Sequence, residues 1–217
     1  MVRAAQNKFE FESQLWSAGL TRVAGVDEAG RGPLAGPVVA AAVVLPSDWE
    51  RMGLPAELDG LNDSKQLTEA KREKFFEALM SLTVIQWAVV SIEASTIDQI
   101  NILQATHRAM NEALTKLEPA PEHALVDGNP VKSLCFPQTA IVKGDARSFS
   151  IAAASVLAKV TRDRQAAEWD GRWPEYGFAV HKGYGTPQHL EAIRKHGPCP
   201  IHRRSFAPLK PVQRELI

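Results

Sequence analysis

The sequence predicts an α/β fold, in which strands and helices alternate along a single chain of 217 residues. Short apolar runs of strand length recur, the clearest being VVAAAVVL at positions 38–45, and β-branched runs of this length are typical of buried strands. Longer segments between them repeat apolar residues at helical spacing, as residues 97–117 do. Three of the short runs end in acidic residues beside glycine, which indicates that one edge of the predicted sheet gathers carboxylates.

Length and charge narrow the possible classes of protein. A chain of 217 residues is long enough for one domain with a substantial core. The formal net charge is zero, but the segment from 181 to the end carries seven basic and two acidic side chains, which leaves a balance of −5 for the first 180 residues. This asymmetry suggests an acidic site beside a basic surface that could meet a polyanion, although a basic tail is commonly only a solvated face.

The cysteines and the apolar segments predict an intracellular protein. Cys135 and Cys199 lie far apart and outside any CxxC pair, so we expect two reduced thiols rather than a disulfide framework or a zinc site. The N-terminal segment lacks the apolar core of a signal peptide, and the longest apolar run, 38–45, is much shorter than a membrane span. We therefore expect a cytoplasmic protein that does not enter a membrane, and a monomer, because no pattern indicates an obligate oligomer.

The first two strands enclose a charged turn. Residues 1–6 look untethered, 9–20 predict a short helix, and the strands at 23–26 and 38–45 are joined tightly enough to be antiparallel neighbours. Neighbouring side chains of a strand point to opposite faces, so the adjacent carboxylates of Asp27 and Glu28 can reach one cation only where the chain bends after them. A metal ion would neutralise the pair, and the alternative is a surface loop in which Arg31 pairs with one of them.

The glycine-rich segment after these acids admits two interpretations. Its glycines loosely resemble a dinucleotide-binding turn, but that fingerprint must open a helix. Pro33 and Pro37 interrupt the segment and a β-branched run follows, which predicts a strand instead. Gly30, Arg31 and Gly32 are therefore interpreted as backbone exposed for the close approach of a ligand.

Residues 46–92 predict a loop, a helix and a third strand. Thr68 is the expected N-cap of a helix over 69–82, and residues 84–92 have the composition of a strand. Asn62, Ser64 and Lys65 form a compact polar cluster before the helix. They predict either a turn with a helix cap or a grip on phosphate, with lysine as a point charge.

A long amphipathic helix is predicted next, opened by a capping box of Ser95 and Asp98. Its apolar stripe comprises Ile97, Ile100, Leu103, His107, Met110, Leu114 and Leu117. We expect His107 to be a core or hydrogen-bonded histidine rather than a ligand, because no acidic or cysteine partner lies at helical spacing.

Two further strands repeat the pattern of an acid at the end of an apolar run. Residues 123–126 lead into Asp127, and residues 139–142 lead into Lys143, Gly144 and Asp145. Any one of these is ordinary turn chemistry. Together with the acids at 27 and 28, they indicate ligands that converge at one edge of the sheet.

The C-terminal third predicts helices around a small aromatic core. The alanine-rich segment 150–164 predicts a helix packed closely on the sheet, in which Asp163 is a surface charge or a member of an ion pair. Aromatic residues then mark a loop with some core of its own: Trp169, Trp173, Tyr176 and Phe178. Thr186 and Pro187 predict the start of a helix that ends near Lys195, and the proline-rich segment after 197 is expected to wrap over the surface.

Seven motifs carry a resemblance to a known family. In chain order they are DEAGRGPLAGPV, NDSKQLT, LVDGN, VKGD, SIAAASVLAKVTRD, HKGYGT and HRRSFAP. This set resembles bacterial ribonuclease HII from Phe9 to Pro208. The sister enzyme ribonuclease HIII usually carries an additional N-terminal domain and a lysine in the glycine loop, whereas position 31 is arginine here and the chain has no room for that domain.

The resemblance implies a fold and a metal site. The fold would be ribonuclease H-like, with a central mixed five-stranded sheet whose first three strands are antiparallel, helices on both faces, and residues 1–217 as one catalytic domain with roughly 170–217 as a helical C-terminal extension. The metal ligands of the family map onto Asp27, Glu28, Asp127 and Asp145, which would bind two Mg²⁺ or Mn²⁺ ions. Such ions activate water and stabilise the leaving oxygen of a phosphodiester, and carboxylates suit them better than histidine or cysteine does.

The resemblance also implies substrates. Enzymes of this family cut the RNA strand of RNA/DNA hybrids and nick duplex DNA 5′ to an embedded ribonucleotide, leaving 3′-hydroxyl and 5′-phosphate ends for ribonucleotide excision repair. Gly30, Arg31 and Gly32 would contact the ribonucleotide 2′-hydroxyl, and Tyr184 would stack on the deoxyribose after the junction. Backbone phosphates would be held by Asn62, Ser64, Lys65 and the basic C-terminal stretch.

Other interpretations remain open at this stage. On local grounds alone, Tyr184 would be an aromatic plug between the C-terminal helix and the core. A hybrid-binding module without catalysis, and a metal-dependent exonuclease or integrase-like nuclease on the same fold, are the alternative functions.

Overall fold

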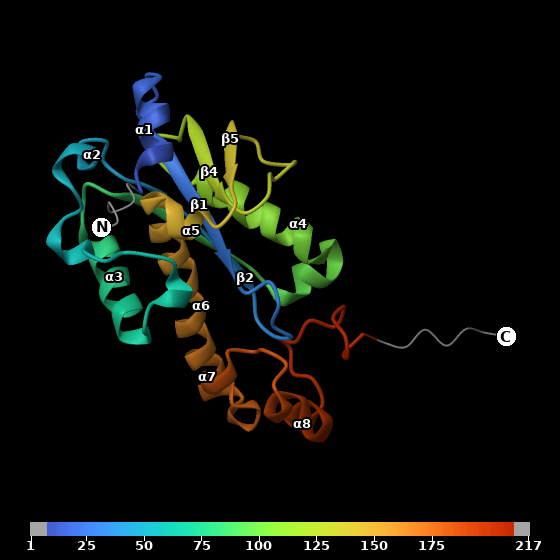
Figure 1. Cartoon of the computed structure of the whole chain (residues 1–217). Helices are drawn as coiled ribbons and strands as arrows, with labels where there is room; N and C mark the ends of the chain where they lie inside the picture. The colour runs from blue at the N-terminus through green and yellow to red at the C-terminus, as the bar shows by residue number, and fades with distance from the viewer. Residues whose placement is uncertain (1–7, 211–217) are drawn as a thin grey trace.

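A mixed five-stranded sheet forms the centre of the molecule. The computed structural model describes residues 8–210, and in this part of the chain the strands lie in the order β3, β2, β1, β4, β5 (Figure 1). They are β1 (Val23–Ala29), β2 (Val38–Val44), β3 (Gln86–Ile92), β4 (His123–Asp127) and β5 (Gln138–Ile141). β1, β2 and β3 pair antiparallel, whereas β4 runs parallel to β1, and β5 parallel to β4. The predicted fold and its antiparallel first three strands are confirmed.

Helices cover both faces of this sheet. α4 (Ala94–Thr115) lies on one face, and α3 (Glu69–Ser81) and α6 (Phe149–Arg172) lie on the other (Figure 1). In β2, Val39 and Ala41 pack in the core under α3 and α6, whereas Val38 and Ala40 pack in the core under α4. Successive strand residues face opposite sides, so a strand covered on both sides must be apolar throughout. This explains the uninterrupted run VVAAAVV.

Shorter elements connect and extend these layers. They are α1 (Glu10–Ser17), α2 (Trp49–Met52), η1 (Ala56–Leu58), η2 (Ser64–Gln66), α5 (Gly144–Arg147), η3 (Pro174–Tyr176), α7 (Phe178–His181) and α8 (Pro187–His196). Thr68 and Thr186 accept the predicted capping bonds at the starts of α3 and α8. α6 continues beyond its predicted end at residue 164, so Trp169 lies in this helix rather than in a loop, and packs with Tyr176 and Phe178 in a small separate core.

α4 departs from the predicted regular helix. Asn101 has φ 66° and ψ 165°, so the element is two helices joined at a kink. The Asn101 side chain caps the second helix by accepting a hydrogen bond from the Gln104 N–H at 3.1 Å. The kink changes which residues face the core. Leu103 and His107 were predicted on the buried stripe, but Leu103 is exposed and His107 is half-buried, while Ala105 is buried instead.

The predicted capping box at the start of α4 is wrong. The N-cap residue is Glu93, which makes no side-chain capping bond. Asp98 instead accepts hydrogen bonds from the backbone N–H groups of Arg204 and Ser205 and from the Ser205 hydroxyl. Asp98 therefore attaches the C-terminal segment to α4.

The segment after Gly197, predicted to wrap over the surface, is partly buried. His202 and Arg203 are buried, and His202 bridges to Ala35 in the loop between β1 and β2. Both cysteines are free, as predicted. Within residues 8–210, no helix combines the length and apolarity needed to span a bilayer.

Candidate active site

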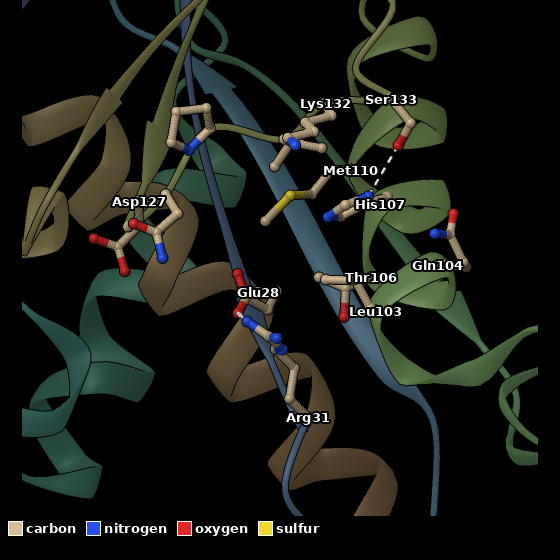
Figure 2. A pocket seen from close by; sticks show the side chains of 14 residues that line it. Glu28, Arg31, Leu103, Gln104, Thr106, His107, Met110, Asp127, Lys132 and Ser133 are labelled. Carbon is tan, nitrogen blue, oxygen red and sulfur yellow. Dashed lines mark hydrogen bonds and ion pairs between the residues drawn. The ribbon is translucent and has the colours of Figure 1, made fainter.

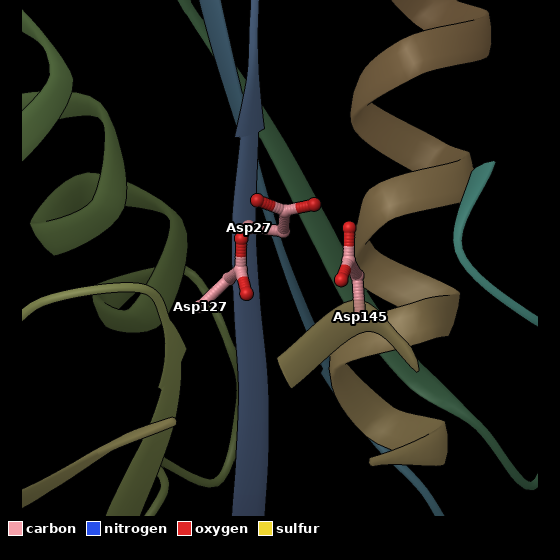
Figure 3. Close-up of side chains that lie close together, drawn as sticks. All are labelled: Asp27, Asp127 and Asp145. Carbon is pink, nitrogen blue, oxygen red and sulfur yellow. The ribbon is translucent and has the colours of Figure 1, made fainter. Parts of the chain in front are cut away.

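Three aspartates meet where the C-terminal ends of β1, β4 and β5 lie side by side (Figure 3). Asp27 lies near the end of β1, Asp127 ends β4, and Asp145 lies in α5 just after β5. Val26 pairs with Val126 in parallel strands, so the residues that follow them lie side by side. One carboxylate oxygen from each aspartate lies within 4.8 Å of those of the other two. The structure thus brings together three of the four carboxylates indicated by the sequence.

A backbone hydrogen bond holds the turn that carries Asp145. The Gly144 N–H donates to Asp127 Oδ1 at 2.7 Å. A Cβ at position 144 would lie 2.6 Å from Ile151 Cδ1 and 3.3 Å from the same Asp127 oxygen, so glycine allows this close approach. The glycine therefore places α5, and with it Asp145, against the end of β4.

Burial and mutual repulsion make this cluster unfavourable without a counter-charge. Burial raises the pKa of Asp27 well above its usual value, and the carboxylates of Glu28 and Asp127 raise it further. Burial likewise raises the pKa of Asp145, and Asp127 adds to the effect. Lys65 Nζ lies 3.4 Å from Asp145 Oδ2 but is itself exposed. A donor set made only of carboxylate oxygens suits a hard divalent cation such as Mg²⁺ or Mn²⁺, so the residues present fit such an ion.

Glu28 stands apart from this cluster. It follows Asp27 in β1 and therefore points to the other face of the strand. Its Oε1 lies 3.3 Å from Arg31 Nη1, which is the local ion pair considered from the sequence. Burial raises the pKa of Glu28, while Arg31 opposes that effect and Asp127 adds to it. Glu28 is therefore within electrostatic reach of the aspartates without sharing their oxygen cluster.

A hollow of about 290 Å³ opens beside Asp27. We call it the glycine-loop hollow, because residues 30–32 form one wall and Lys65 and Tyr184 lie on others. Tyr184 is 48% exposed, and its Cε1 would lie 3.6 Å from a Cβ at Gly32. The predicted substrate residues around the glycine loop therefore share one cavity with Asp27.

Two members of the predicted phosphate cluster have other contacts. Ser64 is buried and shares a 2.8 Å hydrogen bond with Ser155 of α6, which ties η2 to that helix. Asn62 lies outside the glycine-loop hollow, where it accepts a hydrogen bond from Lys8 and donates one to Gln66. Lys65 is thus the member of this cluster whose charged group is exposed beside the acids.

Two buried arginines that the sequence analysis did not identify hold the backbone of the glycine loop. Arg203, 0% exposed, donates to the carbonyls of residues 30, 31, 36 and 37, at 2.9 Å to the Arg31 oxygen. Arg162 donates to the carbonyls of residues 35, 37 and 182, at 3.0 Å to the Ala35 oxygen. A Cβ at Gly30 would lie 2.1 Å from Arg162 Nε, so this glycine is needed for the arginine to fit. Both lie in motifs quoted above, but their role could not be inferred from the sequence, because their partners are distant backbone atoms.

Two buried histidines link Cys199 to the backbone of Tyr184 through hydrogen bonds. The Cys199 N–H donates to His202 Nδ1 at 2.9 Å, so His202 carries its proton on Nε2. That proton points at His189 Nε2, 3.0 Å away, which leaves His189 Nδ1 to donate to the Tyr184 carbonyl at 2.9 Å. The neutral tautomer of each ring follows from its neighbour, and the backbone of Tyr184 is fixed by the last of these hydrogen bonds.

Two predictions outside the cluster can also be assessed. His107 is hydrogen-bonded, with Nδ1 2.9 Å from Ser133 Oγ, as expected, although it is not on the buried stripe. Asp163 forms the expected ion pair, with Lys159 Nζ 2.6 Å from its Oδ1, but it is buried rather than on the surface.

Comparisons with known proteins agree with these observations. A family model for ribonuclease HII matches residues 24–209. The ribonuclease HII of Ruminiclostridium cellulolyticum is 54% identical over 201 residues, which cover 93% of this chain and 76% of that protein. The ribonuclease HII of Endomicrobium trichonymphae is 51% identical over 207 residues, which cover 95% of each chain.

Solved structures share the fold over most of the chain. The ribonuclease H2 from Pyrococcus horikoshii OT3 aligns with a TM-score of 0.71 and 31% identity, over 87% of this chain and 95% of that one. The RNase HII of the PCNA:RNase HII complex from Archaeoglobus fulgidus aligns with a TM-score of 0.69 and 26% identity, over 90% and 98%. Bst-RNase HIII in complex with Mn²⁺, at 21% identity and a TM-score of 0.66 over 88% and 68%, is similar in fold alone. These matches confirm the resemblance carried by the sequence motifs, and the chain belongs to the ribonuclease HII family of ribonuclease H enzymes.

Proposed function

We propose that this protein is an endonuclease that hydrolyses the RNA strand of RNA/DNA hybrids and nicks duplex DNA on the 5′ side of an embedded ribonucleotide. The products would carry 3′-hydroxyl and 5′-phosphate ends, as ribonucleotide removal from DNA requires. The observation that carries the proposal is the convergence of Asp27, Asp127 and Asp145 within 4.8 Å, from three separate elements, beside the glycine-loop hollow.

Two divalent ions, Mg²⁺ or Mn²⁺, would be held by these three aspartates, with Glu28 as the fourth carboxylate. Such ions, when bound, would supply an activated water and stabilise the charge that develops on the leaving 3′-oxygen. The aspartates favour this binding, because their burial and mutual repulsion, which raise the pKa values of Asp27 and Asp145, make the cluster unfavourable without a cation. Lys65, beside Asp145, would attract the phosphate that follows or precedes the cut.

The glycine loop would read the 2′-hydroxyl of the ribonucleotide through its backbone. Arg203 draws the carbonyls of Gly30 and Arg31 toward the interior. In a trans peptide the N–H points opposite to the carbonyl of the same unit, so the N–H groups of Arg31 and Gly32 point outward to the ligand side. Two outward donors can bond the 2′-hydroxyl oxygen, the group that separates RNA from DNA.

Tyr184 would complete the discrimination at the junction. Its ring lies next to Gly32 in the lining of the glycine-loop hollow, and 48% of the residue is exposed, so the ring could pack on a sugar beside the glycine loop. A deoxyribose presents an apolar face at the 2′ carbon, which suits an aromatic ring better than a ribose does. Tyr184 and the glycine loop would thus examine adjacent sugars, one on each side of an RNA–DNA junction.

A nicking assay tests the proposal. Duplex DNA with one ribonucleotide, the same duplex with no 2′-hydroxyl, and a uniform RNA/DNA hybrid are incubated with protein in Mg²⁺, in Mn²⁺ and in EDTA. We expect a metal-dependent cut 5′ to the ribonucleotide and none in the all-DNA duplex. Cutting of all-DNA duplex would indicate a less selective nuclease on this fold, and binding without cutting in either metal would indicate a hybrid-binding module.

The variant Asp127→Asn separates catalysis from binding. It should abolish cleavage while leaving affinity for the hybrid largely intact, because it removes a charged metal ligand and preserves the side-chain volume. Lys116→Gln, on the exposed end of α4, is the control. Turnover near the wild-type level in Asp127→Asn would contradict the assignment of this carboxylate.

A further inference from the structure

A second hollow lies beside Asp127, with Glu28 and Arg31 at its border (Figure 2). It measures about 530 Å³ and lies between α4 residues 103–110 and the loop 128–133. We call it the α4 hollow. Glu28 and Arg31 line both hollows, and Asp127 belongs to the wall of this one. A strand held at the aspartates therefore has a second cavity to enter, separated from the first by the Glu28–Arg31 ion pair.

The walls of the α4 hollow combine apolar surface with polar groups. Met110 and Leu103 contribute apolar atoms, and Leu103 is 46% exposed. Lys132 supplies a cation from the opposite wall. Figure 2 shows the His107 ring reaching in from α4, with its Nδ1 bonded to Ser133 and its other nitrogen left for a ligand. Burial lowers the pKa of His107, with the charge of Arg31 adding, so the ring is neutral at pH 7.

The kink in α4 creates this wall. In a continuous helix, Leu103 and His107 would share the buried stripe with Ile97. Asn101 interrupts the helix and caps its second part, which turns both side chains away from the core and into the α4 hollow. The helix therefore gives up apolar burial at two positions that face the cavity.

The opposite wall is held rigidly before any ligand arrives. Asn111 of α4 donates to the Ser133 carbonyl at 2.9 Å and accepts from the Cys135 N–H at 2.8 Å. Gln138 forms two 2.8 Å hydrogen bonds with the backbone of Val131. A preformed cavity of this size, with a few convergent polar groups, is typical of a small-ligand site.

We propose that the α4 hollow binds a nucleotide of the cleaved strand next to the scissile phosphate, with the base or sugar against Leu103 and Met110 and the phosphodiester beside Lys132. The proposal rests on the proposed function, since it places a further nucleotide of the same substrate. A nucleotide requires both an apolar contact and a cation, and this hollow offers both in direct continuity with the metal-binding acids. Neutral His107 can donate to or accept from the base or sugar without competing for the metal.

Binding of shortened duplexes tests this site. Affinity is measured by fluorescence anisotropy in EDTA, which prevents turnover, for a duplex with one central ribonucleotide and for two duplexes whose ribonucleotide-containing strand stops next to the cut on the 5′ or the 3′ side. We expect Lys132→Gln and His107→Ala each to weaken binding of the full duplex about 3- to 10-fold, the worth of one polar contact. The increase in Kd should vanish for the shortened duplex that lacks the nucleotide in the α4 hollow and persist for the other.

Salt dependence separates the two contacts. Lys132→Gln should reduce the slope of log K against log salt by about one, because one phosphate contact is lost. His107→Ala should leave that slope unchanged, and Lys116→Gln, directly after α4 and outside the hollow, should bind all three duplexes as the wild type does.

Two results would overturn the proposal. One is unchanged affinity of both variants for the full duplex, as expected if a protein partner or a small molecule occupies the hollow. The other is an identical loss on all three duplexes. Failure of the proposed function would look different, because the wild-type protein would then not cut the full duplex in Mg²⁺ at all, whatever the binding measurements show.

Discussion

Replacing Arg203 by lysine tests whether a buried guanidinium holds the glycine loop in place. Lysine keeps the positive charge but concentrates its donors at one nitrogen, whereas the planar guanidinium of Arg203 bonds four carbonyls at once. The adjacent Arg204 provides a matched control. It is exposed, and its side chain donates to the Pro198 carbonyl at 3.1 Å.

The expected magnitude follows from the carbonyls left without a donor. An ammonium group at this depth can retain one or two of the four bonds, and the Pro37 oxygen keeps Arg162 as a donor, so about two buried carbonyls lose their partner. Each such loss costs about 1–3 kcal/mol, and Arg203→Lys should therefore lower the free energy of unfolding by about 2–6 kcal/mol. Arg204→Lys should change it by less than about 0.5 kcal/mol, as is usual for surface positions.

Urea unfolding with linear extrapolation measures both variants. A loss of about 2–6 kcal/mol is a large part of the 5–15 kcal/mol typical of a domain, so nicking should be assayed at a temperature where Arg203→Lys is still folded. There we expect the rate of cutting at a ribonucleotide to fall, because the outward N–H groups of the loop are no longer fixed. If Arg203→Lys and Arg204→Lys unfold within about 1 kcal/mol of each other, the guanidinium does not hold the loop as argued.

Three further predictions concern charge, space and pH. Because burial raises the pKa of Asp27, ionisation of this side chain destabilises the fold as pH rises above about 4. Asp27→Asn should therefore raise the Tm of the metal-free protein at pH 7 by about 2–4 °C. It should also abolish the Tm increase caused by Mg²⁺. An unchanged Mg²⁺ effect would contradict this. Gly30→Ala, whose Cβ would lie 2.1 Å from Arg162 Nε, should cost about 3 kcal/mol or more, against about 1 for Gly60→Ala, which has a similar φ and nothing within 4 Å; equal losses in urea unfolding would refute the steric argument. Burial lowers the pKa of His202 to about 4, so the wild-type protein should lose up to about 3 kcal/mol of stability as pH falls from 6.5 to 4, and a His202→Gln variant with the same pH slope would rule this out.

The strands were predictable because each one is a local pattern. β2 is buried on both faces, so every residue from Val38 to Val44 must be apolar, and the run stands out in the sequence. The acids were predictable for a related reason. Asp127 and Asp145 each follow an apolar strand beside a glycine, and parallel strands place such residues at one edge of the sheet.

The departures come from contacts that leave no local pattern. The kink in α4 depends on one asparagine, Asn101, which is compatible with a regular helix by propensity. The role of Arg203 was missed because its partners are carbonyls up to 173 residues away in the chain. A carbonyl is present at every residue, so a bond to the backbone carries no complementary side chain that could be recognised. The basic tail was accordingly interpreted as surface, although Arg203, the first arginine after His202, is a core residue.

The separation of Asp27 from Glu28 follows from the alternation of a strand, and it organises the whole site. Asp27 faces the glycine-loop hollow with Ser155 and Lys159 of α6, while Glu28 is shared with the α4 hollow, whose wall includes Asp127. Asp127 in turn lies within the oxygen cluster of Asp27. The oxygens of Asp27, Asp127 and Asp145 therefore form one cluster between the two hollows, and Glu28 borders both hollows. A strand with its phosphate at these acids would have one neighbouring nucleotide beside the glycine loop and the other against α4.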